Sequence, residues 1–160
     1  PFDPIDRAAT LWAERVGDAT AMRVVTSVMR VQQLLLTRID ALLKPFGLTF
    51  SRYEVLALLD FSRAGALPLS RIGRRLQVHP TSVTNSIDRL EAAGFVRRVT
   101  DQHDRRRVNA ELTAQGRAVL SEATDALQGA HFCLDGLRPQ TAEQLWQGLS
   151  DIRAQAGDFR

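Results

Sequence analysis

The chain has 160 residues, of which 44% are apolar and 24% are charged, and its formal net charge is +3. This composition argues against a disordered chain, and no run approaches the roughly 18 consecutive apolar residues that a membrane-spanning helix needs. The single cysteine cannot form an internal disulfide, and one cysteine with three histidines in the whole sequence is too few for a zinc cluster. Since no signal segment is recognised at the N-terminus, we expect a folded cytoplasmic protein without metal or cofactor.

Two helices are expected in the N-terminal part, residues 1–47. A short helix covers about 5–16, and a longer one runs from about 20 to 44, where Pro45 ends it. Apolar residues lie on more than one side of the longer helix, so we expect this helix to bury surface against a second subunit. These residues are Val24, Val28, Val31, Leu34, Leu35, Ile39, Leu42 and Leu43.

The middle part, residues 48–112, begins with a further helix. Ser51 and Glu54 have the spacing of a capping box, which predicts a helix from Ser51 to about Ser62. A loop at 64–66 and a short extended piece at 67–69 follow. This extended piece leads directly into the next helix.

Two short helices joined by a tight turn come next. The first spans about 70–78 and the second starts at Pro80, which suits a first helical turn, while Gly94 favours a stop. Ile72, Leu76, Val83 and Ile87 can form one apolar seam between the two helices. On the opposite side of the second helix, polar residues lie four apart: Thr81, Asn85 and Arg89. We interpret the pair as a helix-turn-helix whose second helix presents a polar face outward.

A β-hairpin is expected after Gly94. The runs 95–100 and 106–112 have β-compatible sequences and flank a charged turn. The tip of this hairpin holds three consecutive arginines, Arg105, Arg106 and Arg107. A hairpin that only supports the fold does not need this concentration of guanidinium groups, whereas one that follows a phosphate backbone into a minor groove does.

Two helices are expected in the C-terminal part, residues 113–160. Thr113 caps a helix to roughly Gly136, and a capping box of Thr141 and Gln144 begins another that reaches about 156. Cys133 fits a small, buried packing residue, although a redox role stays open. We expect the two chain ends to form the dimerisation region, which gives a mainly α (α+β) fold.

Charge is distributed unevenly along the chain. Residues 70–108 hold nine arginines against four carboxylates, a net +5, so the remainder carries −2. A basic middle in a mildly acidic frame points to a polyanion that contacts this segment.

Several motifs resemble the MarR (multiple antibiotic resistance regulator) family of winged helix-turn-helix transcription factors. They are GLTFSRYEVLALL at 47–59, DRLEAAGFVRR at 88–98, DRRR at 104–107 and LTAQG at 112–116. The resemblance implies a homodimer that binds an inverted-repeat DNA operator, usually as a repressor, and is released by a small molecule. It implies DNA contacts from the first helix, the start and face of the second helix and the hairpin tip: Ser70, Arg71, Arg74, His79, Thr81, Ser82, Thr84, Asn85, Arg89, Arg105, Arg106 and Arg107.

A small-molecule effector is also implied by the resemblance. Trp12 and Arg23 lie in a segment similar to that of family members that respond to urate and related anions, and Glu54 stands near an acidic position of that subset. These three residues are therefore candidates for binding an aromatic or anionic ligand. Ser86 departs from the subset, which has an arginine there.

Two other classes of protein compete with a DNA-binding regulator. An enzyme would need a cluster of titratable groups, but His79, His103 and His131 lie far apart in sequence and no nucleophile, phosphate-loop or metal motif is present. A winged-helix module for protein interaction stays an alternative, because fold alone does not decide function. Its surface would not need a salt-sensitive arginine cluster.

Overall fold

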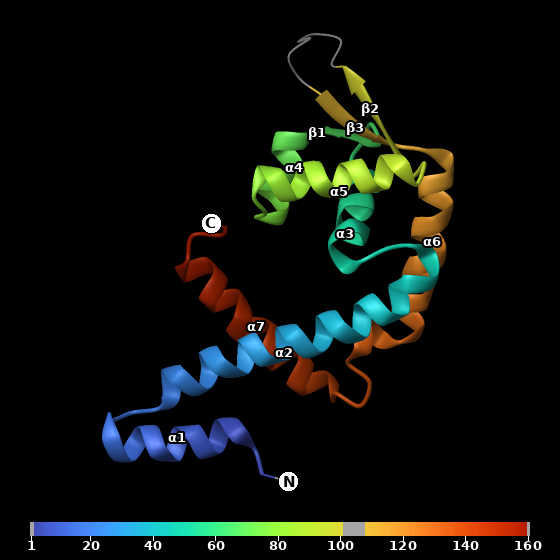
Figure 1. Cartoon of the computed structure of the whole chain (residues 1–160). Helices are drawn as coiled ribbons and strands as arrows, with labels where there is room; N and C mark the ends of the chain where they lie inside the picture. Colours follow the sequence, from blue (N-terminus) through green and yellow to red (C-terminus); the bar gives the residue numbers. More distant parts are fainter. Residues whose placement is uncertain (1, 101–107, 160) are drawn as a thin grey trace.

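The computed structural model describes residues 2–100 and 108–159. Within these ranges, the chain forms mainly helices with one small sheet (Figure 1). The elements are α1 (Pro4–Arg15), α2 (Thr20–Leu43), η1 (Lys44–Phe46), α3 (Phe50–Asp60), β1 (Ala66–Pro68), α4 (Leu69–Leu76), α5 (Pro80–Ala92), β2 (Val96–Thr100), β3 (Val108–Leu112), α6 (Ala114–Gly129), η2 (His131–Cys133) and α7 (Pro139–Gln155).

A winged helix-turn-helix lobe is built from α3, α4, α5 and the sheet, as expected (Figure 1). Its core contains Leu56, Leu59, Ile72 and Ile87, whose exposed fraction is 0% in each case. Full burial of one such side chain stabilises the fold by roughly 1.5–3 kcal/mol. The helix-turn-helix is therefore fixed to α3 and the sheet by packing, and its outer face is left for solvent or a partner.

The sheet has three antiparallel strands in the order β1-β3-β2. The two-stranded hairpin expected from the sequence is thus extended by β1, in which Leu67 pairs with Ala110 and Pro68 with Asn109. Pro68 has no N–H to donate, which is tolerated because β1 lies at an edge of the sheet. The strand β2 forms the other edge.

Helix α6 is anchored to the junction between α5 and β2. The Thr113 hydroxyl accepts a hydrogen bond from the Gly116 N–H at 2.9 Å and donates to the Gly94 carbonyl at 2.7 Å, so Thr113 is the N-cap, as expected. Gly116 is pressed against the chain here, because a Cβ atom would lie 2.0 Å from the Phe95 carbonyl oxygen. The start of α6 is thereby fixed against the winged helix-turn-helix lobe.

The long helix expected from Thr113 to Gly136 ends earlier, at Gly129. The following residues His131, Phe132 and Cys133 have φ values of 45°, 51° and 62°, which end the helix in a left-handed turn. The Arg38 guanidinium of α2 donates to the Cys133 carbonyl at 3.1 Å. This tertiary hydrogen bond, together with burial of Cys133, holds a backbone conformation that non-glycine residues rarely adopt.

Both expected capping boxes are wrong. Helix α3 begins at Phe50, before Ser51, and the Phe50 N–H donates at 2.7 Å to the Asp40 carboxylate of α2. Helix α7 begins at Pro139, and no side chain caps it. Proline suits this first position, because its missing N–H is one of the groups that would lack an acceptor there, and the helix therefore starts before Thr141.

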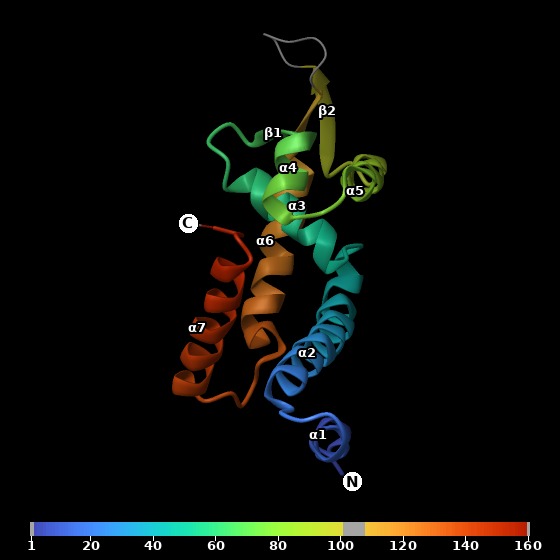
Figure 2. The ribbon, with the colours of Figure 1, turned by 90° about the vertical axis from the view of Figure 1, so that its left-hand side faces the viewer.

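Helices α1, α2, α6 and α7 form an elongated arm. Figure 2 shows α2, α6 and α7 extending away from the lobe, with α1 at the far end. Helix α7 contributes no buried residue. Large apolar side chains on α1, α2 and α7 are left exposed in the single chain: Leu11, Trp12, Val24, Val25, Met29, Val31, Leu34, Leu145, Trp146 and Ile152.

Candidate nucleic-acid interface

The second helix of the helix-turn-helix, α5, has two chemically different faces. Val83, Ile87 and Leu90 are 2%, 0% and 1% exposed and pack into the lobe. The opposite face presents the residues expected to contact DNA, all of which are exposed: Thr81, Ser82, Thr84, Asn85 and Arg89. In Figure 2 this helix stands out from the lobe beside the wing strands. An exposed helix of this kind can enter a major groove.

The start of α5 is held by His79. Its Nδ1 atom accepts from the Thr81 N–H at 3.2 Å and lies 3.1 Å from the Thr81 hydroxyl, so the imidazole serves as the N-cap. Because Nδ1 is used inside the protein, only Nε2 faces outward for a further contact. The Thr84 hydroxyl donates to the Pro80 carbonyl at 3.1 Å, which leaves its oxygen lone pairs and methyl group for a base edge.

Helix α4 brings further basic residues to the same lobe. Ser70, Arg71 and Arg74 are exposed, and the adjacent Arg75 is exposed as well. Close approach of the two helices depends on Gly73, since a Cβ there would lie 3.2 Å from Val83 Cγ2 and 3.3 Å from the Val78 carbonyl oxygen. A cavity of about 440 Å³ remains between the helices, lined by Ser70, Arg74 and Thr84 among others.

Arginines that sequence reasoning counts together fall into two groups. Within residues 2–100 and 108–159, the side chains of Arg71, Arg74, Arg75 and Arg89 make no hydrogen bond or ion pair, so their guanidinium groups are available to phosphate. Arg97 and Arg98, in contrast, are engaged inside the lobe. The expected hairpin-tip contacts, Arg105, Arg106 and Arg107, lie outside the described residues.

Arg98 joins strand β2 to helix α5. Its guanidinium forms ion pairs with Asp88 and Glu91, two carboxylates on α5, and its backbone N–H donates to Glu91 Oε1 at 3.0 Å. The backbone N–H of Arg98, followed by its guanidinium, holds the pKa of Glu91 below the ordinary value of 4.5. Sequence reasoning missed this cluster, although two acids three apart on a helix before an arginine-bearing strand are a visible signal.

Arg97 forms a separate pair within the sheet. It lies directly opposite Glu111 on β3, and the two side chains make a bidentate contact at 3.2 Å and 2.8 Å. Hydrogen bonding to Arg97 lowers the pKa of the Glu111 carboxyl, and the same bond raises the pKa of Arg97. This pair braces the hairpin without touching α5.

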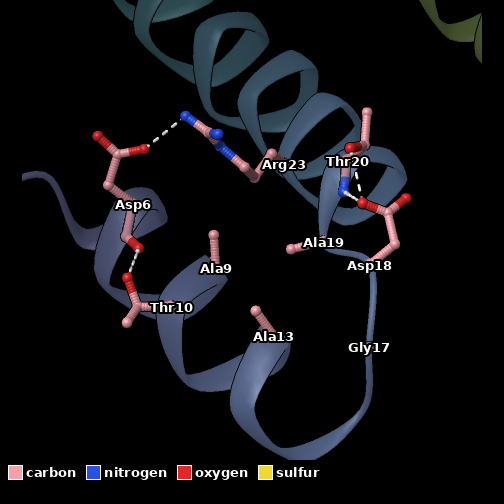
Figure 3. Close-up of a pocket in the computed structure, with 9 residues that line it drawn as sticks. All are labelled: Asp6, Ala9, Thr10, Ala13, Gly17, Asp18, Ala19, Thr20 and Arg23. Carbon is pink, nitrogen blue, oxygen red and sulfur yellow. Dashed lines mark hydrogen bonds and ion pairs between the residues drawn. The ribbon is translucent and has the colours of Figure 1, made fainter.

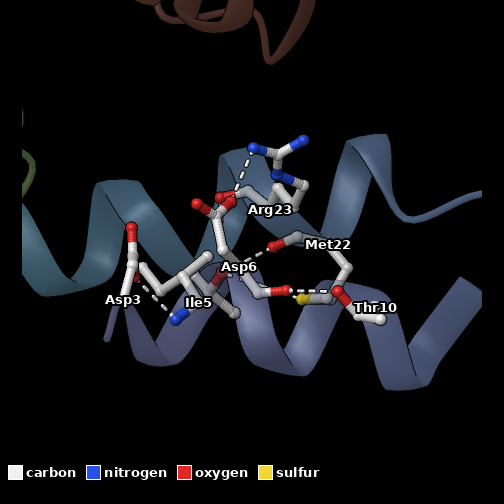
Figure 4. Close-up of polar contacts among 7 residues, drawn as sticks. Asp3, Ile5, Asp6, Thr10, Met22 and Arg23 are labelled. Atoms are coloured by element: carbon white, nitrogen blue, oxygen red, sulfur yellow. Dashed lines mark hydrogen bonds and ion pairs between the residues drawn. The ribbon is translucent and has the colours of Figure 1, made fainter. Parts of the chain in front are cut away.

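The three candidate effector residues are not brought together in the single chain. Arg23 pairs with Asp6 of α1 at 2.7 Å (Figure 4) and lines a cavity of about 510 Å³ between α1 and α2, whose walls include Ala9, Ala13 and Ala19 (Figure 3). Trp12 is 41% exposed on α1, and Glu54 is half-buried on α3, where burial raises its pKa above 4.5. Neither lines this cavity.

A more apolar groove lies between α2 and α7, with Phe50 of the lobe at its edge. Its volume is about 480 Å³, and it is lined from α2, α3, η2 and α7 by residues that include Leu35, Phe50, Phe132 and Leu149. No three His, Cys, Asp or Glu side chains gather to form a metal site in the part of the chain described here. Nor, among the same residues, is any helix long and apolar enough to cross a membrane.

Comparison with known proteins gives consistent similarities. A family model described as "MarR family" matches residues 48–108. Sco5413, a MarR family transcriptional regulator from Streptomyces coelicolor, is 45% identical, with a TM-score of 0.82 over 87% of this chain and 96% of that one. Sco3205 from the same organism, a MarR family regulator solved in complex with DNA, is 25% identical with a TM-score of 0.72, covering 83% and 86% of the two chains.

Among curated proteins, the HTH-type transcriptional regulator PecS of Dickeya dadantii (strain 3937) is 32% identical over 109 residues. That alignment covers 68% of this chain and 66% of PecS, just under two thirds of the relative's length. The matched family segment runs from before α3 to the first residue of β3, and it includes α4 and α5 with their exposed polar and basic residues.

Proposed function

Because the chain belongs to the MarR family of transcriptional regulators, we propose that it binds a two-fold symmetric DNA operator as a homodimer and represses transcription there. One observation carries the proposal: the exposed polar face of α5 stands beside α4 arginines that have no partner among the described residues. Such groups lower the free energy of a DNA complex by replacing the counterions of phosphate. An enzyme has no comparable support, and relatives that are named regulators favour DNA binding over a protein-interaction module.

In this proposal α5 enters the major groove. Asn85 and Arg89 read base edges, with Thr81, Ser82 and Thr84 around them and His79 at the helix start, while Ser70, Arg71 and Arg74 contact phosphates. The wing arginines Arg105, Arg106 and Arg107, which lie outside the described residues, contact the minor groove. Two-fold symmetry places equivalent half-sites about one helical turn apart, roughly 10 base pairs.

The arm supplies the proposed dimer interface. Residues 1–47 and 113–160 form the dimerisation region, and residues 48–112 form the DNA-binding lobe. Trp146 and Leu34 are 61% and 58% exposed in the single chain, with several apolar neighbours on the same helices. Exposed apolar surface of this extent is typical of a protein–protein interface, and a second copy with the same helices can cover it.

Release from DNA is proposed to follow binding of a small molecule near the arm. The apolar groove beside Phe50 and Phe132 connects α2 and α7 with the lobe, so a ligand there can change the spacing of the two lobes. Trp12, Arg23 and Glu54 remain candidates for a ligand's polar groups. Since a regulator of this type acts on chromosomal DNA, we place the protein in the cytoplasm.

Fluorescence anisotropy with labelled duplexes tests the proposed base readout. Asn85→Ala and Arg89→Ala should each reduce discrimination between operator and random DNA by about 1–3 kcal/mol. Arg138→Ala, an exposed arginine at the start of α7, removes the same charge as Arg89→Ala at a distance from α5 and is the matched control. If both α5 variants keep full operator preference, the assignment of α5 to base readout is wrong.

A further inference from the structure

Arg98 connects helix α5, which is proposed to enter the major groove, with strand β2, which together with β3 forms the wing. We propose that Arg98 is a positioning residue which, through Asp88 and Glu91, sets the direction of α5 relative to the wing strands. The inference rests on the proposed function, since it concerns how two DNA-contacting elements are held in one arrangement. It assigns a role in operator recognition to residues that need not touch DNA.

The geometry of this cluster makes it a two-point clamp. Asp88 and Glu91 lie three residues apart on α5, so their side chains project from adjacent positions of one helix face. One guanidinium nitrogen of Arg98 meets Asp88 and the other meets Glu91. Glu91 also accepts the Arg98 backbone N–H, so both side chain and backbone of β2 are attached to the helix.

The clamp acts across the short turn between α5 and β2. Only three residues, Ala93, Gly94 and Phe95, connect α5 to β2, and Gly94 has a φ of +76°. Strand β2 is an edge strand, so no further strand fixes its outer side. The contacts from Glu91 and Asp88 hold β2 on this outer side, where no further strand pairs with it. They also link the wing to the helix independently of the short turn.

Charge gives a second argument for this role. Asp88 has a 53% exposed side chain and precedes Arg89 on the helix proposed to enter the groove. A carboxylate near phosphate weakens DNA binding by repulsion. Arg98, with a 29% exposed side chain, contacts Asp88 and reduces this repulsion, but the ion pair offers phosphate no net positive charge. The carboxylate therefore favours DNA binding only through its contact with Arg98, which orients the helix.

Removing the two carboxylates should weaken operator binding, which is the opposite of what charge repulsion alone predicts. The double variant Asp88→Asn with Glu91→Gln removes two negative charges from the DNA-binding lobe, so repulsion alone would predict tighter binding to every duplex. With the clamp opened, operator affinity should instead fall about tenfold, which corresponds to about 1.4 kcal/mol. Affinity for random duplex should stay equal or rise, because non-specific contacts do not require both elements in register.

Glu111→Gln is the matched control. It also removes a carboxylate from the lobe and breaks an arginine pair, with Arg97 on the same strand, but it does not touch α5. Operator affinity of this variant should be unchanged or slightly higher. Arg98→Ala and Arg97→Ala provide a second comparison with identical loss of charge, in which only Arg98→Ala should lower the operator-to-random ratio.

The measurements are anisotropy titrations of all variants with operator and random duplexes, after circular dichroism shows that each is folded at the assay temperature. Retained random-duplex affinity distinguishes positioning from unfolding, which would weaken both complexes together. If wild type binds operator but the double variant binds it as tightly or more tightly, the clamp is refuted and the proposed function stands. If wild type binds no operator, the proposed function fails and the inference fails with it.

Discussion

Replacing Gly116 with alanine should destabilise the protein, although alanine is the better helix former. The new Cβ would lie 2.0 Å from the Phe95 carbonyl oxygen, 2.8 Å from its carbon and 2.9 Å from Leu112 Cδ1. Two of these are backbone atoms that cannot rotate away, so the start of α6 must shift. Overpacking costs about 1–3 kcal/mol, and weakening of the Thr113 cap adds about 1 kcal/mol. The helix-propensity gain of about 1 kcal/mol offsets part of this.

The expected net loss is about 1–3 kcal/mol, or a decrease in Tm of about 2–12 °C for a domain of this size. Thermal unfolding followed by circular dichroism at fixed protein concentration measures it. Gly129→Ala is the matched control in the same helix, because no atom lies within 4 Å of a Cβ at that position. That variant should be neutral or slightly stabilised. Equal or higher stability of Gly116→Ala would refute the close approach of α6 to the α5–β2 junction.

Three further predictions concern charge and assembly. The pKa of Glu91 is lowered, so its contribution to stability is present above pH 4.5 and is lost as the pH falls through the lower folded-state pKa. Glu91→Gln should therefore be less stable than wild type at pH 7, and this difference should shrink in acid. A difference in Tm that stays constant with pH would contradict this. Burial raises the pKa of Glu54, so stability is lost as the pH rises from 4.5 through the raised pKa. Glu54→Gln should therefore be more stable than wild type at neutral pH and should lose this advantage below pH 4.5. If the variant is instead destabilised at pH 7, the charged carboxylate of Glu54 stabilises the fold. Leu34→Glu should convert the dimer to a monomer in sedimentation velocity, while Phe61→Glu, at a site 84% exposed on the lobe, should leave it dimeric.

Much of the winged helix-turn-helix lobe could be predicted from sequence because its signals are local. The spacing of Val83, Ile87 and Leu90 defines one buried face, and Pro80 and Gly94 mark the helix limits chemically. The long arm helix, expected over about 20–44, spans Thr20–Leu43 for the same reason. Periodicity and strong stop residues identify which face of a helix is buried, even when the partner is unknown.

Features that depend on distant residues were not predicted. Charge counting treats Arg97 and Arg98 as equivalent to Arg71, yet strand pairing directs one to Glu111 and the other to Asp88 and Glu91. The count of nine arginines in residues 70–108 therefore overstates the guanidinium groups available to DNA. Pairing partners of this kind become visible only once the register of β2 is known.

The end of α6 shows the same limit in the backbone. Residues 131–133 contain neither glycine nor proline, so nothing local predicts a left-handed turn there. The conformation is stabilised by the Arg38 contact to Cys133, which comes from another helix. The expected cap at Ser51 failed for the same reason, since Asp40 of α2 accepts from the Phe50 N–H at that helix start. Helix α7 begins at Pro139, before the expected cap at Thr141.

Hydroxyl-radical footprinting on DNA upstream of the protein's own coding sequence tests the central claim most directly. Two lobes related by a two-fold axis should protect equivalent half-sites about 10 base pairs apart, and protection should weaken as salt is raised. Protection of a single half-site, or no protection at low salt by protein that is folded, would contradict a dimeric regulator that grips one duplex with both lobes.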